Sequence, residues 1–404
     1  MRSLGLLILS LAAACGRAGF DERPAADATP MIDAAPDAPA PPVFACGAAS
    51  AVQFPFSGAV QQLSATATLH GYDVLAVNAG EIRGYTYDFS GIGTASSLAA
   101  SRSDVLIAGG AAAAVGAFAI DDDVLVTMPY QNGTAAGTAL LPLDHQLASR
   151  GTPIQHDATF GAGGSIAHNA DGAVVFLSQS FTADSQPAQV TAQLISRLGA
   201  AVDAARSPVE LIPATEIANT PTVAAAGASF VVSWTSATTS PRQAFGRVID
   251  AQLGAVRPAT QISVGPDFTP IAPRVAYAAG ADRYLFVWYE KVAGGADALW
   301  ASVRNPDLSP AGDPVLLTGQ GVLPLVAASD TDFLVVWSDG NESPRLGAAR
   351  VTKDGVRTQL AVTSATNGKV AGWDLTTRYA QPALVWVEVN ADQTEQLWID
   401  PLCP

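Results

Sequence analysis

The sequence predicts an all-β protein, a seven-bladed β-propeller with four antiparallel strands in each blade. The first observation is a repeat. An apolar, β-prone run that reaches a tryptophan recurs at Trp234, Trp288, Trp337 and Trp386 of the 404-residue chain, and its period of about 50 residues is typical of propeller blades. The second observation is composition. The chain has 36 Gly and 27 Pro, which interrupt it too often for long helices, while 49% hydrophobic residues provide ample material for a core.

The repeat extends upstream of the four tryptophans. Similar apolar runs reach Val77, Met128 and Leu177, so the chain contains seven units. The rival folds are a β-helix and a pair of β-sandwiches. The period is too long for one rung of a β-helix and too regular for unrelated sandwiches, so it favours the propeller.

Each unit contains several short β-prone runs separated by turn residues. In the fourth unit, residues 221–225 are mostly small, and residues 230–234 are β-branched or aromatic. Residues 245–249 and 261–263 supply a third and a fourth strand. We expect the small first strand to line the crowded axis and the large second strand to pack between blades.

The last unit lacks a fourth strand. Its first three fall at about 369–375, 383–389 and 396–399, and no further β-prone run follows. The first unit, in contrast, has a surplus run at 51–56 ahead of its own inner strand at 63–69. We therefore predict that 51–56 completes blade seven and closes the ring, which would remove an exposed sheet edge.

The N-terminus has the layout of a secretory signal. Arg2 precedes an apolar run at 4–11, and three alanines then lead to Cys15. This segment resembles a bacterial lipoprotein signal, which implies that residues 1–14 are removed and that Cys15 takes a diacylglycerol. Ordinary signal-peptidase cleavage after the alanines is the alternative, because Leu11 lies four residues before the cysteine, not three. Under the resemblance, Gly16 favours the outer membrane or cell surface.

The sequence thus divides into three segments. Residues 1–14 are the signal, residues 15–45 are a disordered tether rich in Ala, Asp and Pro, and residues 46–404 are the propeller. The blades resemble those of secreted bacterial β-propeller lipoproteins, which read apolar-apolar-Val-Trp-x-acidic, then a short strand and Asp-x-x-Gly. That resemblance implies architecture and export, and it does not imply an activity.

The chain has 3 Cys. With Cys15 assigned to lipid, Cys46 and Cys403 remain, one beside each end of the predicted ring. In an exported protein this pair predicts a disulfide, and two free buried thiols are the alternative.

The loops between second and third strands share one face of a propeller with the loops that enter each blade, and ligands usually bind there. We call it the ligand face. The residues two positions after each reference residue are therefore binding candidates: Tyr130, Gln179, Ser236, Glu290, Asp339 and Glu388. His156 and Asp157 are further candidates for this face. The three acidic residues could hold a cation together, or each could simply cap a turn; whether a metal binds is left open.

No catalytic signature occurs in the sequence, and no cofactor is predicted. The formal charge is −15 and no Lys/Arg cluster is present, so nucleic acid is not an expected partner. We expect a lipid-anchored, extracytoplasmic binding or scaffolding module for protein or polysaccharide. The alternative is a carbohydrate-active enzyme, a glycoside hydrolase or lyase, that uses carboxylates on the ligand face.

Overall fold

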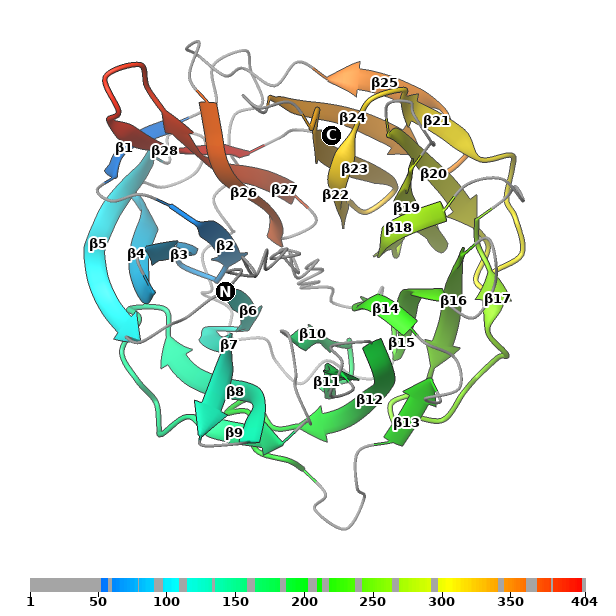
Figure 1. Cartoon of the computed structure of the whole chain (residues 1–404), viewed down its shortest axis with the longest axis horizontal. Helices are drawn as coiled ribbons and strands as arrows, with labels where there is room; N and C mark the ends of the chain where they lie inside the picture. Colours follow the sequence, from blue (N-terminus) through cyan, green and yellow to red (C-terminus); the bar gives the residue numbers. More distant parts are fainter. Residues whose placement is uncertain are drawn as a thin grey trace, which may run out of the picture.

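The computed structural model describes residues 52–401 apart from several loops, and it shows a closed ring of seven four-stranded antiparallel sheets (Figure 1). The loops outside the description are 57–59, 79, 91–96, 109–114, 133–134, 158–163, 182–186, 203–208, 213–217, 237–241, 264–268, 292–296, 341–344, 361–368 and 379–380. The predicted seven-bladed β-propeller is confirmed. The signal segment, the tether and all three cysteines, Cys15, Cys46 and Cys403, lie outside the described residues.

Each blade runs from an inner strand at the ring axis to an outer strand at the rim. Blade one contains β2 (Gln62–Ala67), β3 (Gly71–Asn78), β4 (Glu81–Ser90) and β5 (Ser97–Ala108), and blade two contains β6 (Gly116–Ile120), β7 (Asp123–Asn132), β8 (Ala135–Asp144) and β9 (Ile154–Asp157). Blade three contains β10 (Gly164–His168), β11 (Val174–Phe181), β12 (Pro187–Ile195) and β13 (Val209–Ile212), and blade four contains β14 (Ala218–Ala226), β15 (Ser229–Ser236), β16 (Gln243–Ile249) and β17 (Thr260–Gln261).

Blades five to seven complete the ring. Their strands are β18 (Thr269–Ala278), β19 (Arg283–Lys291), β20 (Ala298–Arg304), β21 (Val315–Thr318); β22 (Val322–Ala328), β23 (Asp332–Ser338), β24 (Leu346–Thr352), β25 (Arg357–Leu360); β26 (Lys369–Arg378), β27 (Gln381–Val389), β28 (Glu395–Pro401) and β1 (Val52–Phe56). All seven reference residues lie on second strands, as the repeat predicted.

Blade seven is built from both ends of the ring. Its strand order is β26, β27, β28 and then β1, which pairs antiparallel to β28 with Val52 opposite Ile399 and Phe56 opposite Glu395. In Figure 1 the blue β1 lies beside the red β28. The closure predicted from residues 51–56 is therefore confirmed. Phe56 also packs on Tyr85 of blade one, with ring centroids 4.6 Å apart.

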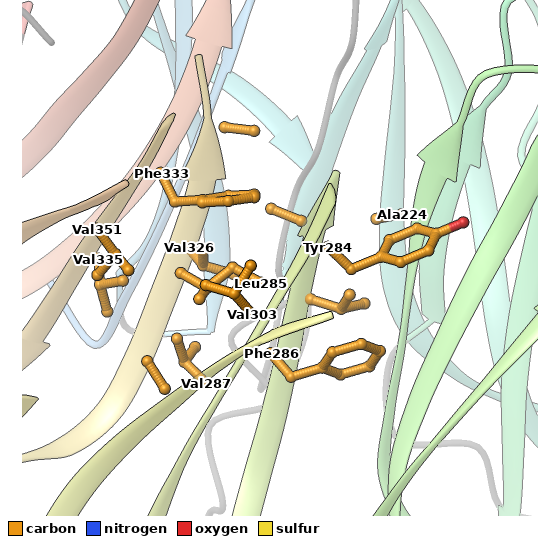
Figure 2. Packing of buried hydrophobic residues seen from close by; sticks show 14 of the residues in the cluster. Ala224, Tyr284, Leu285, Phe286, Val287, Val303, Val326, Phe333, Val335 and Val351 are labelled. Carbon is orange, nitrogen blue, oxygen red and sulfur yellow. The ribbon is translucent and has the colours of Figure 1, made fainter. Parts of the chain in front are cut away.

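The core lies between neighbouring blades. The largest cluster joins blades four, five and six, and Figure 2 shows Phe286 and Phe333 of second strands packed among valines and the small Ala224 of an inner strand. Trp234, Trp288 and Trp386 are almost completely buried. Small inner strands and large second strands are thus arranged as the sequence predicted, because the blades converge at the axis and diverge toward the rim.

Polar side chains link one inner strand to the next. Oγ1 of Thr66 in blade one accepts a hydrogen bond from the backbone N–H of Ala119 in blade two at 2.8 Å. Oγ of Ser165 in blade three accepts one from Val223 in blade four at 3.2 Å. These contacts satisfy backbone donors that no strand pairing reaches at the axis. Within the described part of the chain, no helix is long and apolar enough to cross a membrane.

Candidate functional site

Two hollows lined by described residues lie on the ligand face, one in blade seven beside blade one and one between blades five and six. We call the first the seam pocket, because it lies where blade seven meets blade one. It has a volume of about 740 Å³, which is within the range of about 300–1,000 Å³ usual for small-molecule sites. The second, which we call the blade 5–6 groove, has a volume of about 550 Å³.

Two of the three predicted acidic residues are buried inside their blades. Glu290 is 4% exposed and Glu388 is fully buried. The indole Nε1 of Trp288 donates a hydrogen bond to Oε1 of Glu290 at 3.0 Å. Burial raises the pKa of the Glu290 carboxyl, and this hydrogen bond lowers it in part. Glu290 is therefore a partner of the tryptophan two residues before it, and its carboxylate is directed into the blade.

Asp339 is different because it remains half-buried at the surface. Its Oδ1 accepts the backbone N–H of Arg345 at 3.1 Å, and its own N–H donates to the carbonyl of Arg345 at 3.0 Å. This is the turn-capping role that was the alternative to a cation site. The Asp339 side chain also lines the blade 5–6 groove.

No group of three or more His, Cys, Asp or Glu side chains suited to a metal ion occurs among the described residues. The acidic residues of blades five to seven therefore do not form such a group there. Two further residues of this series, Gln179 and Ser236, are also buried within their blades. They are 5% and 3% exposed, and Ser236 pairs with Gln243 across β15 and β16.

His156 lies on β9, the outer strand of blade two, and contacts blade three. Its Nδ1 is 3.0 Å from Oε1 of Gln193, and its Nε2 is 3.0 Å from the carbonyl oxygen of Gly199. The ring also packs on Phe176, with centroids 5.1 Å apart. His156 thus joins two blades. The backbones of Tyr130 and Asp157 both pair with Gly137, on either side of β8.

The seam pocket is formed by three segments that are distant in the sequence. The start of β26, the hairpin between β27 and β28, and the chain that enters blade one surround it. Its lining residues are Val60, Lys369, Val370, Ala371, Trp373, Val389, Asn390, Ala391, Gln393 and Glu395. Nine of the ten residues belong to blade seven, and Val60 comes from the segment between β1 and β2.

The lining of the seam pocket combines one indole, two amides, one ammonium and one carboxylate. Trp373 is half-buried and packs on the core between blades six and seven, so its position is fixed. Asn390 is held by hydrogen bonds to Thr394, through its side-chain amide at 3.0 Å and its backbone N–H at 2.8 Å. Gln393 occupies the left-handed region with φ of 66°, which turns the hairpin over the pocket.

Glu395 is the carboxylate of the seam pocket. Burial raises the pKa of its carboxyl, and a hydrogen bond from the backbone N–H of Val60 lowers it in part. Its Oε2 atom is enclosed and accepts no hydrogen bond from any described residue. Because Glu395 also lines the pocket, its carboxylate can accept a hydrogen bond from a ligand that donates one.

The blade 5–6 groove has a more strongly charged lining. Arg345 and Arg357 of blade six contribute two guanidinium groups, and Asp339 contributes one carboxylate. Trp337, Gln359 and residues 316–320 complete most of its surface.

Comparison with protein-family models and with curated proteins gives no match. Among solved structures, the chain is similar to the WD40 domain of coronin from Toxoplasma gondii, with a TM-score of 0.52 and 9% sequence identity over 88% of this chain and 86% of that one. This likeness shows the fold alone.

Two carbohydrate-active proteins are also similar at lower TM-scores. An α-L-arabinanase from Penicillium chrysogenum has a TM-score of 0.45 and 10% identity over 69% of this chain and 90% of that one. The polysaccharide lyase Uly1 has a TM-score of 0.47 and 9% identity over 81% of this chain and 89% of that one.

Sequence reasoning missed the seam pocket. Lys369, Trp373 and Glu395 do not share one position of the repeat, and the pairing of β26, β27 and β28 within blade seven brings them together. One signal was available in the sequence. The hairpin at 390–394 is rich in amide and acidic residues and lies directly after the last second strand, on the face where ligands were expected.

Proposed function

We propose that the protein is an exported, lipid-anchored binding module that holds a saccharide in the seam pocket. The observation that carries the proposal is the lining of this pocket, in which the rigid indole of Trp373 faces the same space as Asn390, Gln393, Lys369 and Glu395. A sugar ring has an apolar C–H face and an edge of hydroxyl groups. An aromatic surface with a few fixed donors and acceptors complements both.

The electrostatics of the pocket support a hydroxylated ligand. The carboxylate of Glu395 lines the pocket, and a sugar hydroxyl can donate a hydrogen bond to it. Lys369 and the two amides offer donors to ring and hydroxyl oxygens. A folded protein partner would need about 800 Å² of contact on each side, far more than this hollow provides. Saccharide is therefore the better of the two partner classes that the sequence suggested.

Export and anchoring rest on the N-terminal sequence. The order of basic, apolar and small residues before Cys15 supports cleavage and lipid attachment. A lipid anchor followed by a tether of Ala, Asp and Pro residues would place the propeller outside the cytoplasm, where polysaccharides are exposed.

A glycan array followed by titration calorimetry tests the binding function. The double variant Glu395→Gln and Gln393→Gly should weaken a saccharide hit by roughly tenfold or more, because it replaces the carboxylate with a neutral amide and removes the amide of Gln393. Glycine at 393 suits the left-handed backbone, so folding should be retained. The matched control is Glu210→Gln, an exposed glutamate on β13. Absence of any glycan hit, or equal affinity in the double variant, would contradict the proposal.

A carbohydrate-active enzyme is the second candidate function, and the raised pKa of Glu395 is the observation that favours it. A carboxyl that keeps its proton to higher pH than usual can act as a general acid. The glycan hits should therefore also be incubated with the protein and followed for new reducing ends or unsaturated products. Turnover that is lost in Glu395→Gln would support the enzyme, and binding without turnover would support the module.

A further inference from the structure

The blade 5–6 groove brings together two arginines in a protein whose formal charge is −15. Arg345 is exposed directly before β24, and its guanidinium has no partner among the described residues. Arg357 is exposed on β25, the outer strand of the same blade. The groove is therefore a local positive site on an acidic molecule.

Arg357 is held in place across the gap between two blades. Its Nη1 donates to the carbonyl oxygen of Leu316 in blade five at 3.0 Å, and its Nη2 donates to Oε1 of Gln359 at 3.1 Å. A guanidinium has five N–H donors, so several remain for a ligand. Because the side chain is already fixed, a ligand would lose less of its binding free energy to the ordering of Arg357.

The floor of the groove is rigid. The Trp337 indole is 4% exposed and passes over Gly347, where a Cβ atom would lie only 2.5 Å from Cε2 of the ring. It also passes close to Gly321, where a Cβ atom would lie 2.9 Å from Cδ1. Two glycines thus leave room for the Trp337 ring, and Arg345 and Arg357 line the same groove.

We propose that the blade 5–6 groove binds the carboxylate of an acidic saccharide, so that the ligand of this module is a uronate-containing polysaccharide. This inference rests on the proposed saccharide-binding function and adds the ligand class. Arg345 and Arg357 bind the carboxylate through charge-assisted hydrogen bonds. Asp339 and Gln359 accept and donate hydrogen bonds to neighbouring hydroxyl groups. The seam pocket on the same face holds another unit of the chain.

The mixed charge of the groove selects this class of ligand. A polyphosphate carries closely spaced negative charges, and Asp339 would repel them at short range. A uronate carries one negative charge and several hydroxyl groups on each ring, which matches two cations beside one carboxylate and one amide. A neutral saccharide would leave the two guanidinium groups without a charged partner.

The test compares polygalacturonate with its methyl ester, which has the same backbone but no charge on the carboxyl groups. Alginate and hyaluronan extend the panel. Wild-type protein should bind at least one acidic polymer more tightly than the methyl ester, and its affinity should fall as salt is raised. The double variant Arg345→Gln and Arg357→Gln should lose roughly tenfold or more in affinity for that polymer and most of the salt dependence.

Two further variants sharpen the test. Arg357→Lys keeps the charge but loses the planar fork, so it should retain part of the salt dependence at reduced affinity. Arg257→Gln, which removes an exposed arginine of blade four outside the groove, should bind as the wild type does. Unchanged thermal unfolding of each variant shows that the loss is local.

The outcomes separate this inference from the proposed function. No binding of any acidic polymer, equal binding of the methyl ester, or equal affinity in the double arginine variant would overturn the ligand class. If neutral glycans still bind and depend on Glu395 and Gln393, the proposed function stands without it. If acidic polymers bind and their affinity depends on the arginines but not on Glu395 or Gln393, the groove is supported as a binding site and the proposed role of the seam pocket is contradicted.

Discussion

Oγ of Ser64 donates a hydrogen bond to Oδ2 of Asp374 at 3.1 Å, although the two residues are 310 positions apart in the chain. The backbone N–H of Ala65 donates to the same oxygen at 2.8 Å, and that of Leu375 donates to Oδ1 at 2.8 Å. Asp374 is 4% exposed. One buried carboxylate thus joins the inner strands of blades seven and one, at the axial end of the seam that β1 and β28 close at the rim.

Asp374→Asn should destabilise the ring. The variant replaces a charged acceptor with an amide whose NH₂ group would face an N–H donor, and hydrogen bonds to charged groups contribute more than neutral ones. We expect a loss of about 2 kcal/mol in the free energy of unfolding, measured by urea titration at pH 7. The control is Asp354→Asn, because the Asp354 side chain is 71% exposed. An equal midpoint for the two variants would contradict this role of Asp374.

Gly347→Ala should destabilise blade six and distort the blade 5–6 groove. The added Cβ would overlap the Trp337 ring, and the indole is enclosed by other core residues. Overpacking of this kind costs about 1–3 kcal/mol. Gly312→Ala is the matched control, since a Cβ there would meet no atom within 4 Å. If thermal unfolding of Gly347→Ala equals that of Gly312→Ala, the Trp337 ring is free to move aside.

Asp73 should make stability depend on pH. It is fully buried, and its Oδ1 accepts a hydrogen bond from Oγ1 of Thr86 at 2.8 Å. Burial raises the pKa of this carboxyl well above its usual value, the Thr86 hydrogen bond lowers it in part, and the nearby charges of Asp88 and Asp144 raise it further. The folded protein therefore holds this proton to higher pH than the unfolded chain does.

The sign of the effect follows from this difference. The contribution of Asp73 to stability is complete below the unfolded pKa of about 3.9 and declines as pH rises toward the folded value. Asp73→Asn cannot ionise and should lack this decline. Urea midpoints measured between pH 4 and pH 8 should shift in favour of the variant as pH rises. Parallel profiles for wild type and variant would show that Asp73 does not titrate in this range.

Cys46 and Cys403 should form a disulfide. Both lie outside the described residues, but the strands beside them are placed: Val52 near the start of β1 pairs with Ile399 near the end of β28. The two chains therefore leave the strand pair at the same end, and this arrangement supports a bridge. Because the bridge would enclose nearly the whole ring, its reduction should lower stability by about 2–4 kcal/mol.

Mass spectrometry of a digest without reductant checks the bridge directly. A linked peptide containing both cysteines is the expected product. The control is the same digest after reduction, in which the two peptides should separate. Recovery of both cysteines alkylated without reduction, in exported protein, would rule the bridge out.

The architecture was predictable because it depends on periodic features. Each second strand must be apolar on both sides to pack between blades, so the runs around Trp234, Trp288, Trp337 and Trp386 identified seven blades even where the tryptophan was absent. The closure was predictable for a similar reason. Four strands per unit left one missing after 396–399 and one surplus at 51–56, and β1 and β28 pair accordingly.

Whether each of the three acidic residues is buried or exposed could not be predicted from the pattern alone. Blades five, six and seven all read Trp-x-acidic, but the residue opposite the tryptophan differs. Trp288 and Trp386 pair with Trp300 and Trp398, whereas Trp337 pairs with Gly347. Where two indoles face each other, the glutamate two positions on is buried. In blade six, where the tryptophan pairs with glycine, the aspartate two positions on is half-buried and lines a groove.

The pairing of β1 with β28 also sets the order in which the molecule can be completed. β1 is synthesised first among the strands and its partner last, so blade seven cannot form until all the other blades have been made. Contacts of such long sequence separation are slow to form, and an unpaired β28 edge would be open to other chains until then. A chain interrupted anywhere before β28 lacks the partner for β1. Only a chain that extends through β28 can therefore pair β1 and close the ring.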